Sequence, residues 1–95
     1  MVQSLYERTV DLLSADVGDE LVALDVDAGH CYGFNSVASS VWRQLEQPKS
    51  FDDLKRSLLG EFEVSEDQCT TDLQELLDDL VDKGLLRRTS GRDAR

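Results

Sequence analysis

The stretch that decides the fold is ELVALDVDAGHCYGFN, residues 20–35. Its first half, Glu20 to Asp27, is interpreted as a half-buried β-strand, with Asp25 and Asp27 on the face opposite its large apolar side chains. The large apolar side chains on one face are Val22, Leu24 and Val26. Gly29 marks a turn, and His30 to Asn35 is predicted to be the next strand. The stretch therefore predicts a β-hairpin.

The register of this hairpin depends on the length of its loop, because a slip of one residue turns every side chain to the opposite face. A two-residue turn pairs Val26 with Cys31 and leaves both aromatic residues of the second strand on the outside. A three-residue loop pairs Val26 with Tyr32 and Leu24 with Phe34, so that all the large apolar groups share one face. We favour the three-residue loop.

One more strand and three helices complete the predicted architecture. The strand is expected over residues 9–15. The helices are expected over residues 36 to about 46, from residue 50 to about 62, and over residues 65–83, each following a Ser or Asn whose side-chain oxygen can cap a free backbone N–H. Gly84 ends the last helix as a left-handed C-terminal residue. The sequence thus predicts an α+β, winged-helix-like fold: a three-stranded antiparallel meander followed by three helices.

Length and charge limit the domain count and the partners. With 95 residues the chain forms one domain, which we place at residues 1–88. Residues 89–95 are predicted to be a flexible basic tail outside this domain. We expect the chain to become mobile from Arg87 onward. The formal net charge of −10 disfavours nucleic acid and anionic membrane surfaces. No apolar run approaches the roughly 20 residues of a membrane span, and the N-terminus does not resemble a secretory signal. We expect a cytoplasmic protein.

The sequence offers little for catalysis. Cys31 and Cys69 match no metal-ligand spacing and are expected to be free thiols in a reducing compartment, with a disulfide switch between them as the minor alternative. The single histidine, His30, falls at a turn and has no paired nucleophile. We therefore expect no enzymatic activity, no metal and no cofactor.

The third predicted helix, residues 65–83, is acidic and unusually broad in its apolar arc. Its acidic residues are Glu66, Asp67, Asp72, Glu75, Asp78, Asp79 and Asp82. DNA affinity comes largely from Lys and Arg that neutralise phosphates, so this helix cannot read a duplex. The apolar arc spans roughly 140°, more than the ~100° that one core requires. Cys69 and Leu76 mark one margin, Leu77 and Val81 the other, and either margin can face a ligand.

The last predicted strand, His30 to Asn35, lies at the edge of the meander and carries none of the usual protection. Edge strands are commonly blunted by Lys, Pro or inward-facing charge. Gly33 leaves its backbone unshielded, so another chain can approach closely. An exposed edge beside an apolar helix margin is the geometry of β-strand addition by a peptide. The alternative is a solvated edge whose aromatic residues belong to the core.

An ordered set of motifs runs through the chain. It consists of Tyr32-Gly33-Phe34-Asn35, Ala38, Val41-Trp42, Leu45, Phe51-Asp52-Asp53-Leu54, Asp72-Leu73, Leu76, Leu80 and Gly84-Leu85-Leu86. Over about Leu12 to Arg88 this set resembles the PqqD-like family, the leader-recognition domains of ribosomally made, post-translationally modified peptides. Phe34 departs from the aliphatic residue usual in the family.

The resemblance implies a binding site and partners. A precursor's leader would add as a strand to residues 30–35, in a cleft against the helix at 65–83. The peptide-binding residues implied are Cys31, Tyr32, Gly33, Phe34, Cys69, Leu73, Leu76 and Leu77. A small stand-alone protein of this kind is most like the recognition protein of split lasso-peptide systems. The resemblance implies as partners a separate cysteine peptidase that cuts the leader and a cyclase or other modifying enzyme.

A different class of function also fits the pattern. The chain can be a degenerate winged-helix regulatory or dimerisation module, with the basic tail touching phosphate. The sequence leaves open whether the protein is a monomer or a weak homodimer that pairs through the edge strand.

Overall fold

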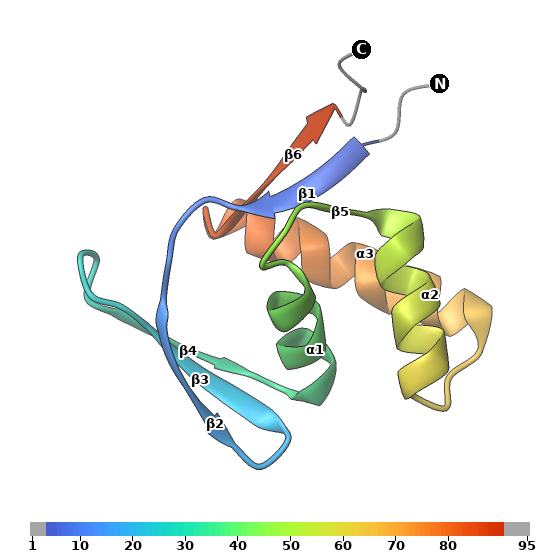
Figure 1. Ribbon diagram of the computed structural model, residues 1–95, viewed down its shortest axis with the longest axis horizontal. Helices are drawn as coiled ribbons and strands as arrows, with labels where there is room; N and C mark the ends of the chain where they lie inside the picture. The colour runs from blue at the N-terminus through green and yellow to red at the C-terminus, as the bar shows by residue number, and fades with distance from the viewer. Residues whose placement is uncertain (1–3, 91–95) are drawn as a thin grey trace.

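The computed structural model describes residues 4–90 and contains three helices and two small antiparallel sheets (Figure 1). The elements in chain order are β1 Ser4–Arg8, β2 Leu13–Val17, β3 Glu20–Asp25, β4 His30–Phe34, α1 Ser36–Gln44, β5 Lys49–Ser50, α2 Phe51–Glu61, α3 Glu66–Asp82 and β6 Leu86–Ser90. The expected α+β class, with a three-stranded meander and three helices, is confirmed.

The meander is formed by β2, β3 and β4 in that order, while β1 lies between β5 and β6 in a second sheet. This second sheet was not expected, because it pairs the two ends of the chain and no local signal marks it. The first strand of the meander begins at Leu13 rather than Thr9. The expectation of a mobile segment from Arg87 onward was wrong for residues 87–90, which form β6. Residues 91–95 lie outside the described part.

The predicted register of the hairpin was wrong. The loop between β3 and β4 has four residues, and it pairs Leu24 with Cys31 and Leu21 with Phe34. The loop is closed on Asp25, whose backbone oxygen accepts from the N–H of Gly29 at 2.8 Å and whose side chain accepts from Ala28 at 3.1 Å. Gly29 has a φ of +71°, a value that favours glycine.

The changed register reverses the two faces of the sheet. Leu21 and Ala23 are buried together with Phe34 against α1, at 4%, 0% and 6% exposure. Val22 and Leu24, expected in the core, lie on the other face. The reason is that both faces of β3 are apolar, and the helical layer covers the one with the smaller residues.

The predicted helix starts are confirmed by their caps. The side chain of Asn35 accepts from the N–H of Ala38 at 2.8 Å, and Ser50 and Ser65 cap α2 and α3 in the same way. At the end of α3, Gly84 has a φ of +77°, as expected. These contacts fix where each helix begins and therefore which face it turns to the core.

The core lies where α1, α2 and α3 meet the inner faces of both sheets (Figure 1). Its buried apolar residues are Tyr6, Leu21, Ala23, Phe34, Ala38, Val41, Trp42, Leu45, Leu54, Leu58, Cys69, Leu73, Leu77, Leu80, Leu85 and Leu86. No helix within residues 4–90 is long and apolar enough to cross a membrane.

Candidate functional site

The meander has two edges, β2 and β4, and β4 pairs with β3 on one side and has no strand on its other side within residues 4–90. The prediction that this strand lies at an edge is therefore confirmed. The strand contains no Lys, Pro or acidic residue that would block pairing. A Cβ atom added at Gly33 would meet nothing within 4 Å. The face of β4 at Gly33 is thus unobstructed, and the open side of the strand is shown by its lack of a second partner strand.

A row of aromatic rings lies along the face of β4 that is turned toward α1. Tyr32 stacks on Phe34, with centroids 6.5 Å apart and planes 12° apart, and Phe34 lies 5.6 Å from Trp42 of α1. His30 meets Tyr32 edge-on at 6.2 Å. Aromatic contacts of this kind stabilise a fold by more than the apolar area that they bury, so the row holds the edge strand against α1.

The structure divides the eight residues of the predicted peptide-binding site into three groups. Phe34, Cys69, Leu73 and Leu77 are buried in the core. Tyr32 and Leu76 are half-buried at its margin, and Cys31 and Gly33 are exposed in β4. By alternation, the last two point away from the helices. The backbone of β4 and the half-buried side chains are the parts open to a peptide, and their role stays a prediction.

The two apolar margins of α3 have different neighbours. Cys69, Leu73 and Asp72 line a small apolar hollow of about 50 Å³, together with Val37 in the first turn of α1. Leu58, Phe62 and Val64 of α2 and the segment after it also line this hollow, so the Cys69 margin packs against α2 and the start of α1. The other margin, at Val81, faces the sheet that contains β1 and β6. Contact of the Cys69 margin with a peptide along β4 stays a prediction.

The cysteines are free, as expected, and lie in unlike surroundings. Burial raises the pKa of the Cys69 thiol, an effect that nearby Lys55 partly offsets. Cys31 is exposed on the face of the sheet turned away from α3. A disulfide between the two would require β4 to turn over, so the thiol switch has no support.

The face of the β2–β3–β4 sheet that points away from the helices, here called the outer face, is apolar and uncovered. Its large side chains are Leu13 at 66% exposure, Val17 at 62%, Val22 at 42%, Leu24 at 40% and Val26, in the adjoining loop, at 61%. The register aligns Leu13 with Leu24 and Leu24 with Cys31 across the strands. The described part of the chain places no helix over this face (Figure 1). The sequence did not predict this face, because Val22, Leu24 and Val26 were assigned to the core.

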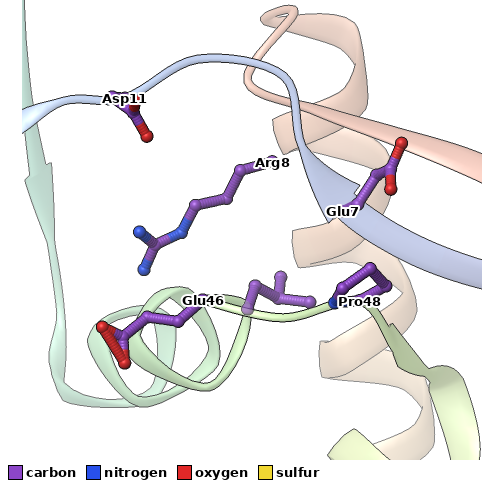
Figure 2. Close-up of a pocket in the computed structure, with 6 residues that line it drawn as sticks. Glu7, Arg8, Asp11, Glu46 and Pro48 are labelled. Atoms are coloured by element: carbon purple, nitrogen blue, oxygen red, sulfur yellow. The ribbon is translucent and has the colours of Figure 1, made fainter.

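A polar hollow of about 440 Å³ lies at the junction of β1 with the end of α1. Figure 2 shows the Arg8 side chain extending into it, with Asp11 and Glu46 on either side of the guanidinium. Arg8 donates to the backbone oxygen of Trp42 and lies 4.3 Å from the centroid of its ring. Desolvation lowers the pKa of Arg8, and the two carboxylates oppose that shift. These contacts of Arg8 hold α1 against β1.

Nothing in the described residues assembles a metal centre: no group of three or more His, Cys, Asp or Glu side chains is placed to hold an ion. The seven acidic residues of α3 are all exposed. Partners on the same helix hold some of them, such as Lys83 with Asp79 at 2.7 Å. Exposed acids on this helix oppose an approach to phosphate, which argues against a DNA-reading role.

The fold defines a winged-helix-like domain in which β4 is an uncovered sheet edge and one face of the same sheet is uncovered. The chain belongs to the PqqD family: the model described as coenzyme PQQ synthesis protein D (PqqD) matches residues 20–86. The match covers β3 to the start of β6 and thus includes the edge strand and all three helices. No curated protein sequence matched the chain.

Two solved structures are similar to the chain over most of its length. One is TbiB1 in complex with the TbiA(beta) leader peptide, with a TM-score of 0.74 and 28% identity, over 85% of this chain and 94% of that one. The other is lasso peptide synthetase B1 complexed with the leader peptide, with a TM-score of 0.70 and 24% identity, over 86% and 96% of the two chains. Both show that the chain shares their fold.

Proposed function

We propose that the protein is a non-catalytic adaptor that binds the leader segment of a ribosomally made precursor peptide, of the lasso class, and presents it to a leader peptidase. The leader adds as a strand to β4 and lies against the Cys69 margin of α3. The observation that carries the proposal is the unblocked edge of β4 in a member of the PqqD family. The similarity to TbiB1, solved with a leader peptide, supports it.

The geometry explains how such an edge recognises a peptide. The main-chain groups of β4 give affinity without regard to sequence, and alternate side chains of the peptide give specificity. On the inner side the peptide meets Tyr32 and Leu76, both half-buried and partly exposed. On the outer side it lies beside Gly33, which presents no side chain. The cleft therefore suits a peptide with apolar residues at alternate positions.

The test is a scan in which single backbone amides of the leader peptide of the co-encoded precursor are N-methylated. Strand addition predicts that methylation weakens binding at every second position, because only alternate N–H groups of an added strand point to β4. The loss is expected to be about tenfold per position, equivalent to a hydrogen bond of about 1.4 kcal/mol. A loss without a period of two, or no binding at all, contradicts the proposal.

A second arm of the test uses the protein. Replacing Gly33 with Pro removes one backbone donor of β4 and is expected to abolish binding. Leu24→Ser, on the outer face, serves as the control and should keep the leader affinity within about twofold. Amide shifts on leader binding should fall within residues 30–35 and 69–80. Shifts confined to other residues would place the peptide elsewhere.

The outer face is the second half of the proposal, because an adaptor needs a surface for the enzyme that is separate from the peptide edge. It exposes five large apolar side chains, and a contiguous patch of this kind on a small protein is typical of a protein interface. We assign it to the leader peptidase. Leu24→Ser should then slow peptidase cleavage of the leader while leader binding persists. Equal cleavage with both proteins would remove the outer face from the proposal.

A further inference from the structure

The sheet that carries the outer face has an unusual charge. Between Val10 and Asn35 the sequence contains six acidic residues and no Lys or Arg. They are Asp11, Asp16, Asp19, Glu20, Asp25 and Asp27. On the inner side, Arg43 of α1 pairs with Asp16 at 2.6 Å, and Arg8 lines the same hollow as Ser14 and Asp16. Within residues 4–90, the charged residues of β2, β3, β4 and their two turns that lie on or beside the outer face are thus acidic.

Three of these acids lie on the outer face or in the turns at its two ends. Glu20 lies opposite Val17 in the register and, by alternation, on the same face as Val22. Asp19 precedes it in the turn between β2 and β3, and Asp27 lies in the loop at the other end of the hairpin. Here these three residues, Asp19, Glu20 and Asp27, are called the acidic border. They stand at both ends of the apolar patch and are all exposed.

An uncovered apolar sheet face is expected to stack on a second copy of itself. Two stacked sheets lie about 10 Å apart, so the acidic borders of two copies would approach to within about one Debye length, where like charges repel. A sheet that carries Lys and Arg around its apolar centre would gain from the burial of apolar surface and from the attraction of opposite charges. The same surface therefore opposes one occupant and favours the other.

We propose that the acidic border selects, for the outer face, a partner sheet bordered by Lys and Arg, and keeps copies of this chain apart. The inference rests on the proposed function, in which this face receives the leader peptidase, and it specifies the chemistry of the surface that docks there. It requires salt to act in opposite directions. Raising the salt concentration promotes self-association of this chain and slows its association with the partner.

The first test uses the protein alone, in sedimentation equilibrium at roughly 25 mM and roughly 500 mM NaCl, where the Debye length falls from about 20 Å to about 4 Å. The wild type should be monomeric at low salt, with a self-association constant that rises about tenfold at high salt. The triple variant Asp19→Asn, Glu20→Gln, Asp27→Asn should associate at low salt already. Adding Leu24→Ser to it should abolish that association.

The matched control changes the net charge equally but elsewhere: Glu75→Gln, Asp78→Asn, Asp82→Asn on the exposed side of α3. It should remain monomeric at low salt, because its outer face keeps the acidic border. If the border variant stays monomeric at every salt concentration, or the control associates equally, the proposal is wrong.

The second test measures association with the purified leader peptidase. The association rate constant should fall about tenfold between the two salt concentrations, and the border variant should show both a lower rate and a weaker salt dependence. Leader affinity, measured in parallel by fluorescence anisotropy, should be the same for wild type and border variant. Loss of leader binding by the wild type would overturn the proposed function. Intact leader binding with a salt-independent peptidase rate would overturn the acidic border alone.

Discussion

The assignment of the two faces of β3 can be tested with one pair of substitutions, Leu21→Ser and Leu24→Ser. The two residues are of one type in one strand, and alternation puts them on opposite faces. Leu21 is 4% exposed beneath α1, whereas Leu24 is 40% exposed on the outer face. The same chemical change therefore samples the core and the candidate interface.

The structure gives unequal magnitudes for the pair. Truncating a buried leucine costs about 2–5 kcal/mol, and burying a serine hydroxyl without a partner adds to that, so Leu21→Ser should cost about 3 kcal/mol or more. Full burial of a leucine contributes about 1.5–3 kcal/mol, and Leu24 is buried only in part, so its loss should cost about 1 kcal/mol. A domain of this size has about 5–14 kcal/mol of stability in total, so both variants can be measured.

The assay is unfolding in urea and by heat, followed by circular dichroism. Since 1 kcal/mol shifts the Tm of such a domain by about 4–8 °C, Leu24→Ser should lower the Tm by about that much and Leu21→Ser by about three times as much or more. Equal m-values in urea would show that both variants lose stability rather than compactness. If Leu24→Ser costs as much as Leu21→Ser, or more, then Leu24 belongs to the core and the outer face as described here is wrong.

Two further predictions follow from burial and backbone geometry. In the folded protein Cys31, which is exposed, should react with an alkylating reagent long before the buried Cys69. Because burial raises the pKa of Cys69, the thiol of the unfolded chain ionises at a lower pH than that of the folded chain, and stability is lost as the pH rises above about 9. Cys69→Ala should reduce this loss, which is measured as the urea midpoint against pH. Gly84→Ala should lower the free energy of unfolding by about 1 kcal/mol, because Gly84 has a φ of +77°. Gly60→Ala should raise it by about 0.5–1 kcal/mol, because Gly60 lies inside α2 and a Cβ there meets nothing within 4 Å. Thermal melts that shift the two variants in the same direction would contradict the geometry.

The helices could be predicted from the sequence because their signals are local. Asn35, Ser50 and Ser65 each bind a backbone N–H three residues on, and Gly84 ends α3. The strands β1 and β6 could not be predicted, since they pair residues about 80 positions apart, as Glu7 does with Arg87. The turn at Gly84 marks the end of α3, but neither strand has an apolar alternation that would have indicated the pairing.

The candidate site was predicted in part, for a related reason. The position of β4 at an edge follows from the order of the strands, which the turns at Gly18 and Gly29 set locally. Which side chains face the cleft depends on the register, and the register depends on a loop whose four residues are fixed by the bonds to Asp25. An error in loop length therefore left the strand right and its faces wrong.

The error over the faces of β3 has a physical cause that bears on the function. A strand whose two faces are both apolar gives no alternation that separates core from surface, and the larger residues, Val22 and Leu24, were taken for the core. In the structure the helices cover Leu21 and Ala23, and the larger side chains remain outside. A monomer gains nothing from large apolar residues exposed to water, and the proposed function accounts for them by covering this surface in a complex with the leader peptidase. On that proposal, the pattern that misled the fold prediction is the sequence signature of the peptidase interface.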